Sequence, residues 1–222
     1  VVYVGTGAYL GAADVKNTDT QTIYALKDPV ALNASVTDLA KSSKSTATYP
    51  NPRANTCTAT TKTACFTKNP LINVTGNKRK IDSTATGAVN YDADFATMNG
   101  WYADMPTAGE RIDTDPDLQL GTLAFTSNKP ATNDPCSAGG SSYLNYLDYK
   151  TGKNVPGASD VGVSLSKGST SALSTAVTLI RLPNGKVVGV TNLSDGSSTS
   201  VETPVRASGT GTRRVTWREL VN

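Results

Sequence analysis

The segment from Gly100 to Gly152 constrains the fold of this 222-residue chain more than any other part of it. Its short apolar runs alternate with turn residues, and single charges lie between them at Glu110, Arg111, Asp113 and Asp148. This alternation is typical of antiparallel strands joined by turns, with buried polar side chains that fasten loops to strands. No long segment has the apolar period of an amphipathic helix, so the sequence predicts an all-β fold.

The order of motifs in this segment resembles the signature block of the PilC/PilY family of tip-associated adhesins of type IV pili. The resemblance rests on Trp101, the Gly109-Glu110-Arg111 triplet, Pro135-Cys136, Gly139-Gly140-Ser141 and Asp148. Residues 1–14, 21–28 and 210–220 resemble the beginning and end of the same family region. The resemblance implies the C-terminal β-propeller portion of a longer, exported protein, and it leaves 33–90 and 153–176 unmatched.

The strand pattern is consistent with part of a propeller. About twelve predicted strands at four per blade give about three blades, fewer than a complete propeller usually has. We therefore expect one domain over residues 1–222 that is an incomplete propeller or a stack of sheets with exposed edges. The predicted strands are 1–4, 22–27, 71–74, 78–82, 100–104, 110–114, 121–127, 142–149, 178–182, 186–191, 201–206 and 213–220.

One turn is predicted in detail. Asn184-Gly185 lies between two apolar runs, and both residues tolerate the positive φ of a type I′ turn. The sequence therefore predicts a tight hairpin there.

A long Ser/Thr-rich insertion is predicted at about 33–69, starting with a short helical turn near 37–41. Cys57 and Cys65 lie within it, close enough to form a disulfide-closed loop in an oxidising compartment. Cys136 is then left free or paired outside this chain. Metal binding by the three thiols is disfavoured, because there is no CxxC spacing and no histidine to complete a site.

The absence of histidine limits the chemistry of the chain. It excludes Ser-His-Asp and Cys-His mechanisms and histidine zinc sites. Neither a GxSxG elbow nor a phosphate-binding GxxxxGK[ST] loop is present, so we expect no enzyme activity. The net charge is +3 with scattered basic residues, which does not indicate a nucleic-acid groove, and the short basic run 78–80 is interpreted as a solvated strand end.

Three aspartates have the spacing that begins a calcium loop: Asp113, Asp115 and Asp117. Such a loop would next need Gly at position 118 and Glu at position 124, where this chain has leucine and alanine. We therefore expect no cofactor and keep calcium as the weaker alternative. A structural role is favoured, in which Asp113 or Asp115 caps a turn or pairs with Arg111.

The two tryptophans, Trp101 and Trp217, are predicted to be core anchors whose N–H groups find carbonyl partners. Glu110 and Arg111 are adjacent, so on a strand they point to opposite faces, and we expect each to engage a neighbouring loop rather than the other. Asp148 completes this set of structural anchors.

No apolar stretch approaches the roughly 20 residues that cross a bilayer. The strand-like start at Val1 lacks an initiating methionine, which favours a C-terminal piece of a longer protein. The resemblance implies a non-enzymatic module at the pilus tip, exported through the periplasm to the cell surface. Its implied roles are adhesion, pilus assembly and opposition to retraction, with minor pilins and the missing N-terminal part as partners. The alternative function is a self-assembling extracellular fibre subunit, formed by β-strand addition between the edges of neighbouring chains.

Overall fold

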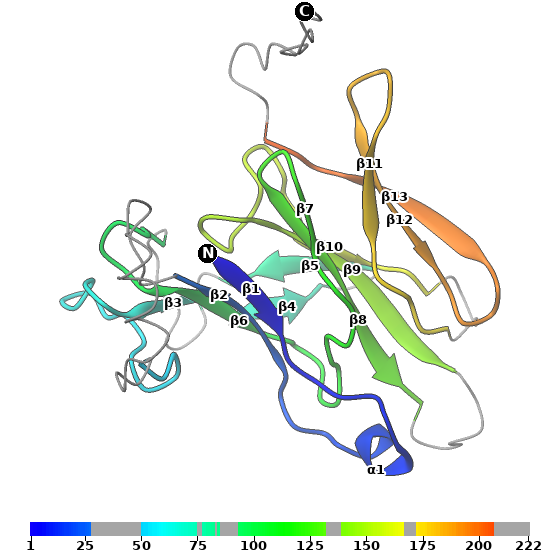
Figure 1. The fold of residues 1–222 in the computed structure, drawn as a ribbon, viewed down its shortest axis with the longest axis horizontal. Helices are drawn as coiled ribbons and strands as arrows, with labels where there is room; N and C mark the ends of the chain where they lie inside the picture. The colour runs from blue at the N-terminus through cyan, green and yellow to red at the C-terminus, as the bar shows by residue number, and fades with distance from the viewer. Residues whose placement is uncertain are drawn as a thin grey trace, which may run out of the picture.

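The prediction of an all-β fold is confirmed. The computed structural model describes residues 1–27, 50–74, 77–82, 84, 93–131, 139–166 and 172–206. In these residues it contains three separate β-sheets and one short helix, α1 (Ala12–Val15) (Figure 1). No helix within the described ranges is long and apolar enough to cross a membrane.

The first sheet begins at the N-terminus and has the strand order β1-β2-β6-β3. The pairs β1–β2 and β2–β6 are antiparallel, whereas β3 pairs with β6 in parallel. Its strands are β1 (Val2–Gly5), β2 (Thr22–Leu26), β6 (Gly100–Asp104) and β3 (Phe66–Lys68).

The central sheet has six strands in the order β4-β5-β10-β9-β8-β7. Its last four strands are consecutive in the sequence and antiparallel, so they form a four-stranded meander, to which the β4–β5 hairpin adds. The strands are β4 (Leu71–Asn73), β5 (Lys78–Ile81), β7 (Asp117–Gln119), β8 (Thr122–Pro130), β9 (Gly140–Asp148) and β10 (Gly162–Ser164).

The third sheet is an antiparallel meander of β11 (Thr178–Arg181), β12 (Val187–Asn192) and β13 (Ser198–Thr203). The predicted hairpin joins β11 to β12, but its turn is not type I′. Gly185 has a φ of 86°, whereas Asn184 is not among the described residues with positive φ. Pro183 explains the difference, because its fixed φ favours a type I turn followed by a left-handed glycine.

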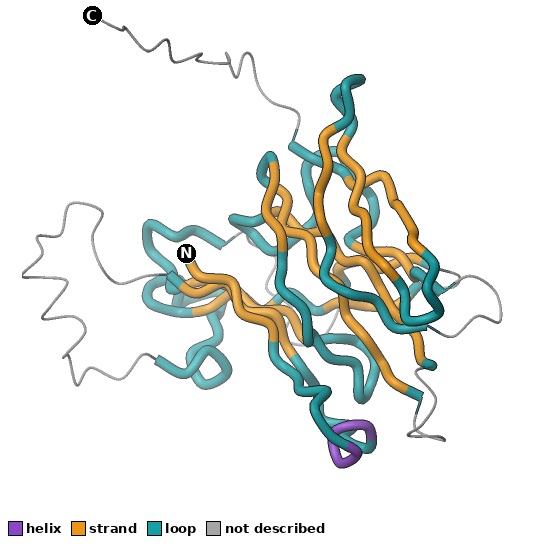
Figure 2. The backbone as a smooth tube through the Cα atoms, turned by 45° about the vertical axis from the view of Figure 1, so that its right-hand side comes forward, coloured by secondary structure: helices purple, strands orange, loops and turns teal. Residues whose placement is uncertain are grey.

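The three sheets stack as layers, with the central sheet between the other two (Figures 1 and 2). One apolar cluster joins the first and central sheets through residues such as Ile23, Trp101 and Phe125. A second cluster joins the central and third sheets through Leu144 and Val187, among others. Both faces of the central sheet are therefore buried, which accounts for the long apolar runs of β8 and β9.

Several strand predictions differ from the structure. The predicted strand 110–114 is wrong: only Arg111 forms a bridge there, with Asn128. Gly109 turns the chain before it with a φ of 75°, and Pro116 follows it. In place of the predicted strand 201–206, the structure has β13, which begins and ends three residues earlier in the sequence. The sequence missed β3, β7 and β10, which have three residues each and show little periodicity; β4, equally short, was predicted within 71–74.

Part of the predicted insertion can be compared with the structure. Residues 50–69 form a loop that ends in β3. The predicted helical turn near 37–41 and the predicted strand 213–220 lie outside the described residues.

Candidate functional site

The Gly-Glu-Arg triplet forms a turn between the first and central sheets, and Glu110 points from it to strand β5. Its carboxylate forms a bidentate ion pair with Arg79. Arg79 Nη1 lies 2.7 Å from Glu110 Oε1, and Arg79 Nη2 lies 2.6 Å from Glu110 Oε2. Both side chains are completely buried. Such bidentate geometry is the strong form of an arginine–carboxylate contact.

The buried ion pair is enclosed by further polar side chains. Asn145 and Asn73 accept hydrogen bonds from the Arg79 guanidinium at 2.8 and 3.0 Å, and Ser127 donates to Glu110. The guanidinium also stacks 3.6 Å from the centre of the Tyr143 ring. These contacts leave the pair no free face for a ligand, so its role is structural.

The interpretation of 78–80 as a solvated strand end is therefore wrong for Arg79. Strand β5 pairs Arg79 with Gly162, and this register directs the arginine side chain into the protein. Lys78 and Lys80 are exposed, as expected for alternate residues on a strand.

Arg111 points away from Glu110 and binds the N-terminal loop. Its guanidinium donates to the carbonyl oxygens of Ala8 at 2.9 Å, Asp14 at 2.6 Å and Asn17 at 3.1 Å. The suggested pairing of Arg111 with Asp113 or Asp115 is wrong, because backbone carbonyls of a distant loop take its donors.

Trp101 of β6 packs near Asp148, the last residue of β9. Trp101 is fully buried, and its Nε1–H donates to the carbonyl of Tyr149 at 3.2 Å. Asp148 Oδ1 accepts the amides of Lys150 and Thr151, which shapes the turn after β9. Its Oδ2 accepts a hydrogen bond from Arg206 Nε at 2.6 Å.

The three aspartates considered for calcium are not gathered into a site. Asp113 Oδ1 accepts a hydrogen bond from Asn128, and Asp117 Oδ2 accepts the amide of Leu179 at 2.7 Å. Within the described parts of the chain, no three Asp, Glu, Cys or His side chains are grouped to hold a metal ion. Asp113 and Asp117 thus act as connectors between segments.

Cys57 and Cys65 form a disulfide in the structure. Both are buried and pack with Met98 in a small cluster below the loop. Cys136 and Trp217 lie outside the described residues.

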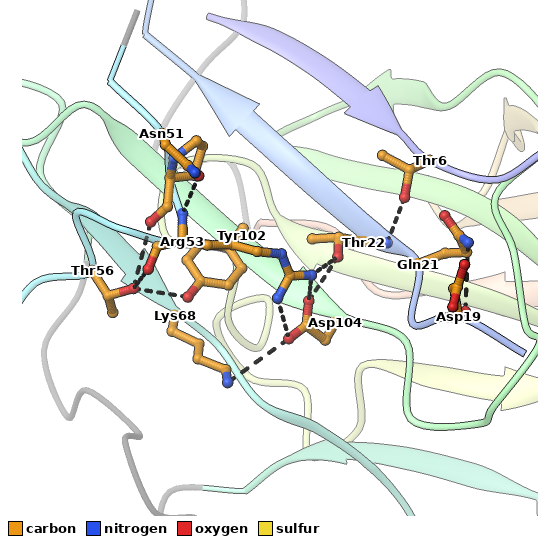
Figure 3. Close-up of polar contacts among 11 residues, drawn as sticks. Thr6, Asp19, Gln21, Thr22, Asn51, Arg53, Thr56, Lys68, Tyr102 and Asp104 are labelled. Atoms are coloured by element: carbon orange, nitrogen blue, oxygen red, sulfur yellow. Dashed lines mark hydrogen bonds and ion pairs between the residues drawn. The ribbon is translucent and has the colours of Figure 1, made fainter.

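A partly buried polar cluster on the outer face of the first sheet was not expected from the sequence (Figure 3). At its centre is Asp104, whose Oδ1 lies 2.7 Å from Arg53 Nη2 and accepts the Thr22 hydroxyl at 2.7 Å. Lys68 Nζ lies 3.8 Å from Asp104 Oδ2, and the Arg53 guanidinium lies 5.7 Å from the centre of the Tyr102 ring.

The contacts within this Asp104 cluster shift the pKa values of two of its members, Arg53 and Tyr102. Burial lowers the pKa of Arg53, but the hydrogen bond and charge of Asp104 outweigh burial, so the pKa is raised overall. Burial, the largest cause, raises the pKa of the Tyr102 phenol. The Asp104 carboxylate contacts two cations, Arg53 and Lys68, and the Thr22 hydroxyl. The cluster has one more positive than negative charge.

Apolar side chains continue this outer face towards β1. The strand register places Val4, Tyr24, Tyr102 and Lys68 in one row across the four strands. Val2 and Val4 are 54% and 41% exposed. Sequence reasoning had one signal for this face: Trp101 and Ala103 point inward, so Tyr102 and Asp104 must point outward. Arg53, which contacts Asp104, lies in a loop, where no strand alternation indicates the direction of its side chain.

Together these features define an all-β scaffold, fastened by buried polar contacts, with an exposed apolar and basic surface on its first sheet. The chain is similar to a Xylella fastidiosa (strain Temecula1) protein named type IV pilus biogenesis factor PilY1 homolog. The two are 24% identical over 182 residues, which cover 78% of this chain and 10% of that protein. This chain therefore spans about a tenth of the length of that relative. No protein-family model matches the chain, and no solved structure matches it.

Proposed function

We propose that this chain is part of a non-enzymatic protein of type IV pilus biogenesis. The observation that carries the proposal is the similarity to the PilY1 homolog, which extends over 78% of the chain. The stacked sheets and the Asp104 cluster support a scaffold with a binding surface. The site residues offer no nucleophile–base pair that would favour a catalytic role.

Within that role, the three sheets correspond to blades of an incomplete β-propeller. The four-stranded antiparallel meander β7–β10 has the form of one blade, and the three-stranded meander β11–β13 has most of another. The disulfide between Cys57 and Cys65 supports export to the cell envelope or beyond, where disulfides persist. The proposed location is the pilus tip, and the proposed partners are minor pilins and other parts of the same protein.

The test is an in-frame deletion of this region in the bacterium that encodes it. We expect fewer surface pili by electron microscopy, and recovery of pili when the retraction motor is also removed, because the module would oppose retraction. Adhesion per pilus, measured on host cells, tests the adhesive role separately.

The complemented strains separate a specific role from a general one. The intact region and a Glu202→Ala variant, which changes an exposed ion pair, should restore pili. Glu110→Ala should not, because it breaks the buried pair that holds the fold. Normal piliation in the deletion strain would refute the proposal.

A further inference from the structure

A cavity of about 330 Å³ lies at one end of the third sheet, between the β12–β13 turn and the chain that follows β10. Its volume is within the range of small-molecule sites, roughly 300–1,000 Å³. Leu165, Ala172 and Leu193 contribute apolar side chains to its wall. The other lining residues are four hydroxyl side chains and one carboxylate, and none of the described residues that line the cavity is basic.

Thr199 of β13 lines this cavity with a buried hydroxyl that has no partner. Its side chain is only 8% exposed, and the hydroxyl forms no hydrogen bond with any described residue. Other buried threonines of the third sheet are satisfied. Thr191 donates to the carbonyl of Thr175 at 2.9 Å, and Thr203 donates to that of Val201 at 3.2 Å. Because most buried polar side chains have such a partner, the Thr199 hydroxyl is available to a molecule in the cavity.

Asp195 brings the carboxylate to the rim of the cavity from the β12–β13 turn. Its Oδ1 accepts hydrogen bonds from the hydroxyl and the amide of Ser197, at 2.6 and 2.9 Å. These hydrogen bonds, that of the hydroxyl first, lower the pKa of Asp195. Its Oδ2 has no hydrogen-bond partner in the part of the chain that the structure describes. The turn therefore presents an ionised carboxylate with one free oxygen.

The free groups of the cavity select the kind of ligand. A carboxylate oxygen forms strong, charge-assisted hydrogen bonds with hydroxyl donors, and a threonine hydroxyl can donate or accept. The carboxylate and the lack of a basic side chain disfavour an anion. Calcium needs six to eight oxygen ligands, and the described residues contain no group of three acidic side chains that could hold a metal ion. A neutral ring with several hydroxyls and an apolar C–H face fits these groups best.

We propose that this cavity binds a single sugar ring. The sugar hydroxyls bind Asp195 Oδ2 and the Thr199 hydroxyl, and one C–H face of the ring lies against Leu165 and Leu193. The affinity is expected to be roughly millimolar, because a ligand of this size makes few contacts. Sugar binding at this cavity does not depend on the proposed role in pilus biogenesis.

Titration of the full chain, followed by heteronuclear NMR of its amide groups, tests the proposal. The probes are the methyl glycosides of glucose, galactose, mannose and N-acetylglucosamine. With at least one of them, we expect saturable shifts of the amides of Leu165, Ser197 and Thr199 and a dissociation constant in roughly the millimolar range.

Two variants connect binding to the free groups. Thr199→Val removes the hydroxyl with little change in shape and should weaken binding roughly tenfold, the value of one hydrogen bond. Asp195→Asn removes the charge and should weaken binding by a similar factor. Thr178→Val, at an exposed position of the same sheet, and Asp115→Asn, at an exposed carboxylate, are the matched controls and should bind like the unchanged protein.

Each other outcome overturns the proposal. The absence of saturable shifts with all four glycosides in the unchanged protein would show that the cavity binds no sugar, even if the variants misfold. Equal binding by both variants and the unchanged protein would place the sugar elsewhere. Shifts of the same amides with calcium chloride or methylammonium chloride, but with no glycoside, would assign the cavity to a cation. Amides of Phe125 and Leu144 report whether the fold is intact in each variant. None of these results changes piliation, which is measured in the bacterium.

Discussion

Arg79 and Glu110 form an ion pair in which neither side chain is exposed, although they are 31 residues apart in the sequence. The pair fastens strand β5 of the central sheet to the turn that follows the first sheet. Two buried charges are tolerated here because Ser127, Asn145 and Asn73 satisfy the remaining hydrogen-bonding groups.

Removing one partner of this pair should be strongly destabilising. Glu110→Ala leaves a buried guanidinium without its carboxylate, and we expect the free energy of unfolding to fall by about 3–5 kcal/mol. Urea denaturation followed by circular dichroism measures the change. Glu202→Ala is the control, because the Lys186–Glu202 pair is exposed and should contribute less than about 1 kcal/mol. Equal losses in the two variants would contradict a structural role for the buried pair.

The sequence alone leads to Glu110 and Arg111 but not to their partners. Adjacent residues on an extended backbone point in opposite directions, which predicts that the two do not pair with each other. Arg111 binds a loop, as expected, whereas Glu110 binds strand β5 rather than a loop. The partner Arg79 was missed because its burial depends on the register between β5 and β10, a contact between segments far apart in sequence. A run of three basic residues gives no sign that its middle member is buried.

The same limit applies to the fold and to the Asp104 cluster. The all-β class follows from local alternation, whereas the parallel pairing of β3 with β6 depends on a loop whose path local sequence does not encode. Arg53 reaches Asp104 from such a loop. Contacts between segments far apart in the sequence, such as those of Arg53 and β3, could not be predicted from local pattern.

The stabilising role of Arg111 should require a guanidinium group, which lysine cannot replace. It donates to carbonyls of Ala8, Asp14 and Asn17, and a lysine ammonium cannot span these acceptors. We expect Arg111→Lys to lower the free energy of unfolding by at least about 2 kcal/mol, the value of one hydrogen bond to a charged group. Hydrogen exchange in residues 7–17 should become faster. Arg181→Lys, at an exposed arginine, should change neither quantity; a similar loss there would argue against the loop contacts.

Asp160 should contribute to stability in a defined acid range. The hydrogen bond from Lys78, 2.6 Å away, is the main cause that holds the pKa of Asp160 below its ordinary value. A lowered folded-state pKa means that this stabilisation is present above the unfolded pKa, about 3.9, and is lost as the pH falls through the folded-state value. Asp160→Asn should therefore lose stability at pH 7 and show a flatter decline below pH ~4. Thermal unfolding from pH 7 to 2 measures this. Asp115→Asn, at an exposed carboxylate, is the control, and an identical acid profile for Asp160→Asn and the unchanged protein would disprove the contribution.

Gly152 and Gly185 separate the effect of backbone strain from that of packing. Both have positive φ, 67° and 86° respectively, so alanine is strained at either position by about 1–2 kcal/mol. A Cβ at Gly185 meets no atom within 4 Å, whereas at Gly152 it would collide with the ring of the buried Trp101 and lie 2.6 Å from Asn69 Nδ2. Overpacking of this kind costs about 1–3 kcal/mol more. We expect Gly152→Ala to unfold at lower urea than Gly185→Ala and to perturb the near-ultraviolet circular dichroism of Trp101. If both variants were destabilised equally, Trp101 would not be tightly packed against the turn after β9.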